Sequence, residues 1–175
     1  AAIGTVTDQP VRIVINTGGQ DHRWLGNGYF RERGARIVAS VRAVADQKDR
    51  QSQQFTMLEM LIGKERLAGT EPVYAEETFE GTGEFGFGGL TFQLANTAPA
   101  HTPGDTHVWV PEKSTVFTGD IVYVDRLLGV LDHSDSAGWV KAFEAIAALS
   151  PTHIVPGHGG ATDLATATAE TYDYL

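Results

Sequence analysis

Histidine and aspartate recur at four places where a predicted strand gives way to a loop. The four segments are Asp21-His22, Ala100-His101-Thr102-Pro103-Gly104-Asp105, Thr118-Gly119-Asp120 and Pro156-Gly157-His158-Gly159. Any one of them alone is more often a turn or a helix cap than a ligand set, because Asp and Gly favour turns. Four of them in one chain predict a shared polar site of the kind found in α/β metallo-enzymes.

Composition restricts what such a site can contain. The absence of cysteine excludes disulfides, thiolate metal sites and a cysteine nucleophile, so a metal ion would be held by His and carboxylate groups. The 22 acidic residues outnumber the 13 basic ones, and the net charge of -9 disfavours nucleic-acid binding. No apolar stretch approaches the roughly 18 residues of a membrane span. We therefore expect a soluble protein with a small-molecule substrate; residues 1–10 lack the pattern of a signal peptide, and any targeting signal lies upstream.

The hydrophobic pattern predicts a single α/β domain over residues 1–175. Apolar and β-branched runs predict strands at 11–15, 35–39, 90–94, 106–110, 115–118 and 153–155. Apolar residues at helical spacing predict helices at 40–63, 136–147 and 163–175.

Local signals set several boundaries between these elements. Pro111 starts a turn that makes 106–110 and 115–118 a hairpin. Gly81 to Gly89 holds five glycines, more than a regular element tolerates, so we expect a hairpin or a mobile loop there. Ser136 precedes the apolar spacing of the next helix and is expected to be its N-cap.

The order of the four segments resembles the metallo-β-lactamase-fold hydrolase superfamily over nearly the whole chain. In that family a strand ends in a Thr-His-x-His-x-Asp-His motif, followed by a lone His in a Thr-Pro-Gly-rich loop, a bridging Asp in a Gly-Asp step and a final His in Pro-Gly-His-Gly. The corresponding segments here are Asn16-Thr17-Gly18-Gly19-Gln20-Asp21-His22, His101-Thr102-Pro103-Gly104-Asp105-Thr106, Phe117-Thr118-Gly119-Asp120 and Pro156-Gly157-His158-Gly159. The resemblance implies an αββα sandwich in which one or two zinc ions, or iron or manganese, polarise a carbonyl or phosphoryl group and activate a water.

The first segment departs from the family pattern. Gly18 and Gln20 stand where the family has two His, and the segment is one residue shorter between Thr17 and Asp21. Of the three His that hold the first metal in the family, only His101 remains. The resemblance leaves a second ligand set complete, so one zinc ion is expected rather than two. Its members are Asp21, His22, Asp120 and His158, with Asp21 and Asp120 as the catalytic carboxylates.

Three alternatives remain open for the metal. Four protein ligands that include two carboxylates can close a tetrahedral site, which would then be structural or weakly catalytic. In the second alternative, His101 and Gln20 act as replacement ligands and leave a position for water. In the third, no metal binds, and repulsion between Asp21 and Asp120 raises the pKa of one of them and makes the loops mobile.

The other histidines and two aromatic residues have mainly structural interpretations. His107 and His153 are expected to be packed or surface residues rather than ligands. His133 lies in the loop after the third segment, where the family often places substrate contacts, and is a candidate for that role. Trp24 and Tyr29 are expected in the core rather than in a pocket.

The ends of the chain predict an incomplete sandwich. The family has several strands before the first motif, whereas only residues 1–10 precede the first predicted strand. Residues 1–8 resemble the tail of the helix that follows those strands, and the last helix is cut at Leu175. We therefore expect a fragment, or a shortened form, that lacks the N-terminal strands. An uncovered sheet edge and apolar face then predict a homo-oligomer or strand exchange.

Three functions compete on this basis. The first is a metal-dependent hydrolase that acts on an ester, thioester, lactam or similar bond through a metal-activated water. The second is a non-catalytic relative in which the second ligand set holds a structural ion or none. The third and weakest is a binding or assembly module whose exposed sheet face is the interface. The fold itself supports all three, because one fold hosts many activities.

Overall fold

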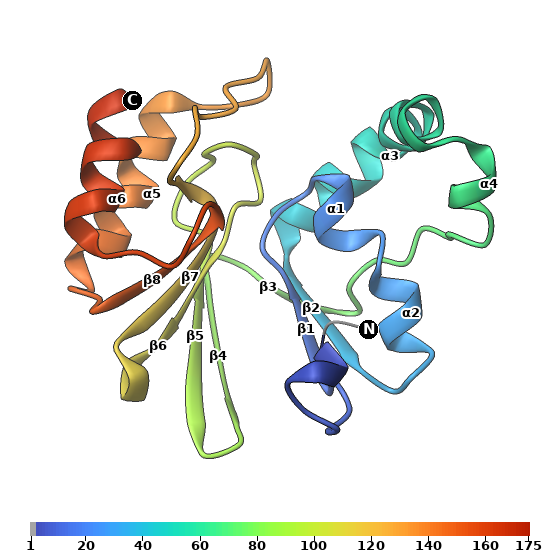
Figure 1. Cartoon of the computed structure of the whole chain (residues 1–175), viewed down its shortest axis with the longest axis horizontal. Helices are drawn as coiled ribbons and strands as arrows, with labels where there is room; N and C mark the ends of the chain where they lie inside the picture. Colours follow the sequence, from blue (N-terminus) through green and yellow to red (C-terminus); the bar gives the residue numbers. More distant parts are fainter. Residues whose placement is uncertain (1–2) are drawn as a thin grey trace.

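The computed structural model describes residues 3–175, whose strands form two sheets that face each other with helices on both outer sides (Figure 1). The first sheet is parallel and has the order β1 (Ile13–Asn16), β2 (Arg36–Ser40), β3 (Glu77–Phe79). The second sheet follows chain order, with β4 (Thr82–Phe87), β5 (Leu90–Ala95), β6 (His107–Val110), β7 (Thr115–Tyr123) and β8 (His153–His158). Its neighbouring strands are antiparallel except for the parallel pair β7 and β8. The predicted α/β sandwich with two sheets is confirmed.

Helices cover the outer side of each sheet (Figure 1). Those beside the first sheet are α1 (Asp21–Trp24), α2 (Asn27–Arg31), α3 (Val41–Ile62) and α4 (Lys64–Leu67), and those beside the second are α5 (Ser136–Ala148) and α6 (Leu164–Glu170). Short 3-10 turns occupy Ile3–Thr5, Pro111–Lys113 and Tyr172–Tyr174. Within residues 3–175, no helix combines the length and apolar character that crossing a membrane requires.

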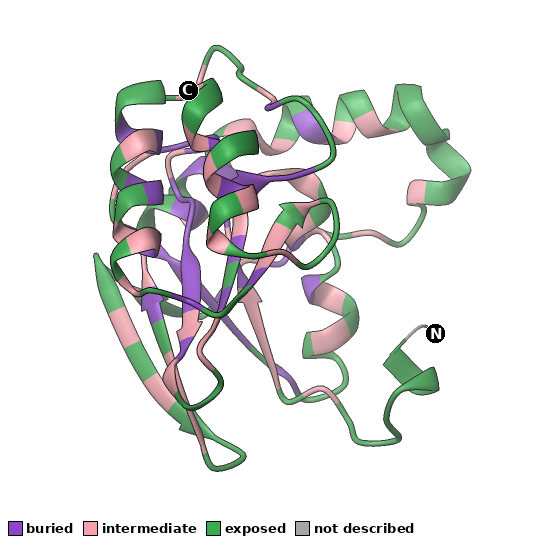
Figure 2. Cartoon of the chain, turned by 60° about the vertical axis from the view of Figure 1, so that its left-hand side comes forward, coloured by how far each residue is buried: buried purple, intermediate pink, exposed green. Residues whose placement is uncertain are grey.

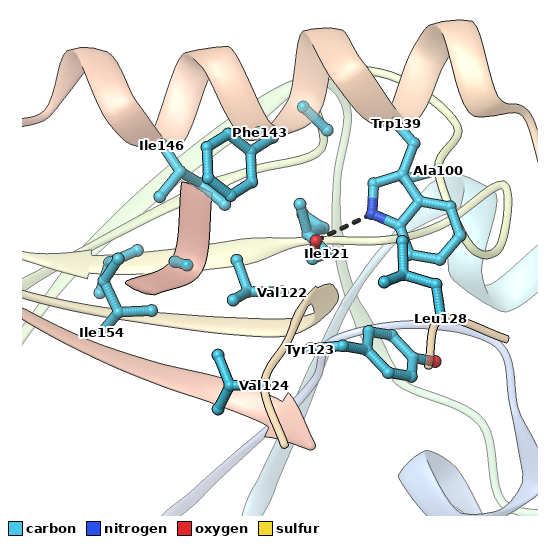
Figure 3. Close-up of a cluster of buried hydrophobic side chains, with 13 residues drawn as sticks. Ala100, Ile121, Val122, Tyr123, Val124, Leu128, Trp139, Phe143, Ile146 and Ile154 are labelled. Atoms are coloured by element: carbon cyan, nitrogen blue, oxygen red, sulfur yellow. Dashed lines mark hydrogen bonds between the residues drawn. The ribbon is translucent and has the colours of Figure 1, made fainter. Parts of the chain in front are cut away.

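Three apolar layers hold these elements together, and the buried residues concentrate on the strands and on the inner faces of the helices (Figure 2). Between the sheets, Val38, Leu94 and Val108 form a small buried cluster. The largest cluster lies between the second sheet and α5, where the indole of Trp139 donates a hydrogen bond of 2.8 Å to the main-chain oxygen of Ile121 (Figure 3). This bond satisfies the indole N–H at a fully buried position.

Of two local predictions, the hairpin at Gly81 to Gly89 is confirmed, and the N-cap of α5 needs correction. Gly83 and Gly86 lie inside β4, so the glycine-rich segment is a regular hairpin strand, and the turn is made by Gly88 and Gly89 at positive φ. A Cβ atom at Gly83 would press on Phe79, which gives this strand glycine a packing reason. The N-cap of α5 is Asp135, not Ser136, because the Asp135 carboxylate accepts a hydrogen bond of 2.9 Å from the main-chain nitrogen of Gly138.

The start of the chain also differs from the expectation. Only Ile3–Thr5 is helical within residues 3–8, and it is a 3-10 turn rather than the tail of an α-helix. Ala1 and Ala2 lie outside the described residues. At the edge of the first sheet, three of the four residues of β1 are only half-buried. Self-association through such a surface stays a prediction.

Acidification is expected to destabilise the fold through His107 on β6. Burial lowers the pKa of His107 to about 4, whereas the unfolded chain titrates near the ordinary value of about 6.5. The unfolded state therefore binds the proton first, and the free energy of unfolding falls as the pH decreases from about 6.5 to about 4. When the pH is lowered from about 7.5 to about 5, the free energy of unfolding should decrease in both proteins. The decrease should be about 2 kcal/mol smaller in His107→Leu than in the wild type. Urea unfolding at both pH values measures this difference, and equal losses would contradict it.

Candidate metal centre

Three side chains from distant parts of the sequence meet at one site. His22 lies on α1, Asp120 lies within β7 and His158 ends β8. Their ligand atoms all lie within 4.8 Å of one another. Nε2 of His22 is 3.8 Å from Oδ2 of Asp120, and Nε2 of His158 is 3.7 Å from Oδ1 of the same carboxylate. The structure therefore brings together three of the predicted ligands.

Asp120 reaches this site because β7 is irregular. The strand was expected to end at residue 118, but it continues to Tyr123, and its register with β8 shifts on both sides of Gly119. Gly119 has a φ of 51°, a conformation that favours glycine. A Cβ atom at Gly157 would overlap Oδ1 of Asp120. The two glycines thus let the carboxylate lie directly against the backbone of β8.

His101 lies beside this group without joining it. Its side chain is buried, and Nε2 is 3.9 Å from Oδ2 of Asp120. Within residues 3–175, neither ring nitrogen of His101 has a hydrogen-bond partner. Burial lowers the pKa of His101, so the imidazole is uncharged near neutral pH. An unpartnered buried nitrogen costs free energy unless a water or an ion binds it.

Arg23 supplies a fixed positive charge at the centre of the site. Its side chain, which is 5% exposed, donates hydrogen bonds to Oδ1 of Asp105 at 2.7 Å and to Oδ2 of Asp120 at 2.6 Å. Burial alone would lower the pKa of Arg23, but the charges of the two carboxylates more than offset this effect and raise the pKa above its ordinary value. The guanidinium therefore neutralises part of the charge of Asp120 that a metal ion would otherwise balance.

This guanidinium also fills space expected for the first metal site. A Cβ atom at Gly18 would overlap Nη1 of Arg23, and the Oε1 atom of Gln20 accepts a hydrogen bond of 2.9 Å from Nη2. Gln20 is thus engaged with Arg23 rather than grouped with His101 as a replacement ligand. Counted from Thr17 without a gap, the family motif places its His at positions 18 and 20, its Asp at 22 and its last His at 23. The central position of Arg23 fits this ungapped register, in which no residue is missing.

Asp21 does not join the group of three. Its Oδ1 atom accepts a hydrogen bond of 2.7 Å from the main-chain nitrogen of His22 and lies 3.1 Å from Nδ1 of the same residue. The hydrogen bond from His22 lowers the pKa of Asp21, so Asp21 is not a carboxylate whose pKa is raised by repulsion. With its Nδ1–H donated to Asp21, neutral His22 has a free electron pair on Nε2, as metal-binding histidines commonly do.

His158 is held by two neighbours. Its ring lies against Tyr123 with the ring centroids 4.7 Å apart, and its Nδ1 is 3.2 Å from Nη1 of Arg126. A guanidinium can only donate, so Nδ1 accepts and the proton of neutral His158 lies on Nε2. Arg126 in this position opposes metal binding by the nitrogen that faces Asp120.

The donor set nevertheless fits one zinc ion in composition and spacing. Zinc takes imidazole and carboxylate ligands at about 2.0–2.2 Å, which places the ligand atoms of a tetrahedral ion about 3.4 Å apart. Nε2 of His158 lies 3.7 Å from Oδ1 of Asp120, close to this spacing, and the ligand atoms of the three residues, all within 4.8 Å of one another, would move closer together around one ion. Within the described part of the chain, three donors form the group. An ion held by these three donors would keep a fourth position open.

Arg126→Ala is expected to tighten zinc binding by about tenfold, because Nδ1 of His158 then no longer faces a cationic donor. Arg126 is exposed, so the substitution should leave the fold intact. Competition with a zinc-binding dye measures the affinity. The matched control is Arg42→Ala, which removes an exposed arginine at the start of α3 and should change nothing. An unchanged affinity in Arg126→Ala would mean that this arginine does not oppose the ion.

Three charged residues of the site are missing from the sequence prediction. Arg23 could have been found from its place at the last position of the ungapped motif. Asp105 is fully buried and also accepts a hydrogen bond of 2.6 Å from the main-chain nitrogen of Thr102. The residues around Arg126 do not indicate that it belongs to the site. Its contact with His158 depends on how the segment after β7 folds back toward β8.

The remaining predicted residues have varied positions. His107 is buried and His153 is exposed, so the first is a packed residue and the second is a surface residue. Trp24 is in the core, where its indole donates a hydrogen bond of 2.9 Å to Oε1 of Gln54. Tyr29 is 56% exposed, so its expected place in the core is wrong. The fifth residue, His133, faces α3, and its substrate contact stays a prediction.

Solved structures share this fold at low sequence identity. A metallo-beta-lactamase from Pontibacter korlensis has a TM-score of 0.75 and 20% identity, with 99% of this chain and 73% of that chain covered. The metallo-beta-lactamase FIM-1 from Pseudomonas aeruginosa, in its mono-zinc form, has a TM-score of 0.71 and 21% identity, with 95% and 66% covered. A metallo-beta-lactamase from Erythrobacter litoralis has a TM-score of 0.72 and 18% identity, with 98% and 70% covered. At such identities the likeness establishes the fold alone.

Sequence comparison identifies the family directly. No curated protein matches the chain. The family described as the Metallo-beta-lactamase superfamily matches residues 5–158, which include every member of the candidate metal centre. Because this match spans most of the chain, the protein belongs to the metallo-beta-lactamase superfamily.

Proposed function

We propose that the protein is a metal-dependent hydrolase that binds a single divalent ion, zinc first and iron or manganese as alternatives, and cleaves an ester, thioester, lactam or similar bond. The observation that carries this proposal is the convergence of three protein donors, His22, Asp120 and His158. With Asp21 outside the group, the set leaves room for a water, whereas four protein ligands would have closed the site. A bound ion of this kind polarises a carbonyl and makes a neighbouring water more acidic.

The protein's own residues have distinct roles in this proposal. His22 and His158 offer Nε2, and Asp21 is a positioning residue that fixes the ring of His22 through Nδ1. Asp120 offers Oδ1, because Oδ2 is bonded to Arg23. Hydrolysis joins the water oxygen to the acyl carbon and breaks the bond from that carbon to the leaving oxygen, sulfur or nitrogen. The proton released by the water passes to the leaving atom, so that a carboxylic acid and an alcohol, thiol or amine are formed.

The test compares hydrolysis of a p-nitrophenyl ester, a thioester and a β-lactam by the zinc-loaded protein and by His22→Ala. The proposal predicts turnover of at least one substrate, and a loss of at least about tenfold in kcat/KM for the variant. His153→Ala, which removes an exposed histidine elsewhere on β8, is the matched control and should retain full activity. Equal turnover by wild type and His22→Ala would refute the proposal.

A second candidate is a non-catalytic relative that serves as a binding or assembly module, with a structural ion or none. The observation in its favour is Arg23, which already balances the charge of Asp120 and Asp105. In this case zinc produces no hydrolysis, whereas a structural ion would still raise the stability of the fold. Absence of turnover with all three substrate classes would favour this candidate. A zinc content that His22→Ala lowers would then indicate a structural ion, and an unaltered content would indicate that this site holds none.

A further inference from the structure

A cavity of about 730 Å³ opens beside the metal centre, between α3 and the segment that follows β7. This volume is within the range of small-molecule pockets. One wall is the last part of α3, with Met57, Leu58, Met60 and Leu61, and the facing wall includes Val130 and Leu131. Five of these six side chains are large apolar groups that are 48% to 78% exposed, although apolar residues of this size are usually buried.

Two of the polar residues of the cavity lie next to the candidate metal centre. Gln20 and Asp21 both line the cavity, and Asp21 also holds the ring of His22. One molecule could thus place an apolar part between the two walls and a reactive bond near His22. The cavity therefore adjoins the site of the proposed reaction through Asp21.

Charge restricts the kind of molecule that fits. Asp21 and Asp132 are the carboxylates of the lining, and Arg50 is its cationic side chain. Arg50 already donates hydrogen bonds of 2.7 and 2.5 Å to the two carboxylate oxygens of the buried Asp46. Its Nη1 atom also lies 3.1 Å from Nε2 of His133. The lining therefore offers no strong site for an anion, and a free fatty acid is disfavoured against an uncharged molecule.

We propose that this cavity binds the apolar acyl chain of an uncharged ester, with the ester group directed toward His22. This inference rests on the proposed function and deepens it, because it names the substrate class. Methionine side chains suit such a pocket, because they adapt their shape to flexible chains. Binding should be tighter for longer chains, by roughly threefold to fourfold for each added methylene that is buried.

The test measures binding rather than turnover. Ethyl butanoate, ethyl hexanoate and ethyl octanoate are titrated calorimetrically into the chelator-treated protein, with octanoate as the charged comparison. The inference predicts that affinity rises along the ester series and that ethyl octanoate binds at least about tenfold more tightly than octanoate. Met57→Glu and Val130→Glu, both at exposed positions, should each weaken the binding of ethyl octanoate by about tenfold or more. Val41→Glu, at an exposed position on the same helix but outside the cavity, is the matched control.

Each other outcome has a defined meaning. An affinity that does not depend on chain length, or that Val41→Glu lowers as much as Met57→Glu does, overturns the inference. Sedimentation that shows a dimer converted to monomers by Met57→Glu would assign these apolar walls to a second copy of the chain and overturn it as well. Ester binding to a zinc-loaded protein that hydrolyses none of the three substrate classes would refute the proposed function and leave the inferred binding site intact.

Discussion

Arg23→Leu is expected to lower the free energy of unfolding by about 3–5 kcal/mol. The substitution removes the guanidinium that bonds to Asp105 and Asp120, and it leaves both carboxylates in a site where each side chain is at most 3% exposed. Uncompensated charge at such positions is strongly destabilising, because water cannot solvate it. Urea unfolding near neutral pH measures the change.

Two controls make this result specific to the paired charges. Arg42→Leu removes an exposed arginine and should change stability by no more than about 0.5 kcal/mol. Arg23→Lys should give an intermediate loss, because an ammonium group lacks the planar fork that bonds two carboxylates at once. A loss below about 1 kcal/mol for Arg23→Leu would show that the pairing contributes little.

Restoration of the family motif should succeed only when Arg23 is also replaced. Gly18→His with Gln20→His places two imidazoles where the guanidinium already lies, since even a Cβ atom at Gly18 overlaps Arg23. This double variant should be destabilised and should bind no additional zinc. Adding His22→Asp and Arg23→His completes the motif in the ungapped register, and the fourfold variant should bind about two zinc ions in place of one.

Zinc content and hydrolysis of the two variants test this register. If the double variant gains a second zinc ion while Arg23 is still present, the segment after Thr17 does not follow the ungapped register inferred above. A fourfold variant that folds, by circular dichroism, and binds no more than the wild type would mean that the loop geometry has moved away from that of the family.

The sheets could be predicted from the sequence because their signals are local. The β-branched run at 11–15 and the hairpin around Pro111 depend on neighbouring residues alone, and the structure contains both with shifts of a few residues. Asp120 was expected at a strand end, but it lies inside β7. Its position results from the irregular pairing of β7 with β8 at Gly119. Such an irregularity depends on both strands, so the sequence of one strand does not predict it.

The candidate site was predictable in its histidines and not in its arginines. His22 and His158 lie in motif segments whose spacing is conspicuous along the chain. Whether the side chain at 21, 22 or 23 points into the site depends on how α1 begins after β1, and a shift of one residue changes the direction of every side chain. The acyl cavity was equally invisible, because it forms where α3 faces a segment about seventy residues later.

The central claim is that this member of the superfamily retains one metal position, formed by His22, Asp120 and His158, while Arg23 occupies the space of another. Its most direct test is the zinc content of the protein after equilibration with zinc and dialysis, measured by mass spectrometry beside that of His158→Ala. The account predicts about one equivalent in the wild type and less than about a tenth in the variant. Two equivalents in the wild type, or a content that the variant leaves unchanged, would contradict it.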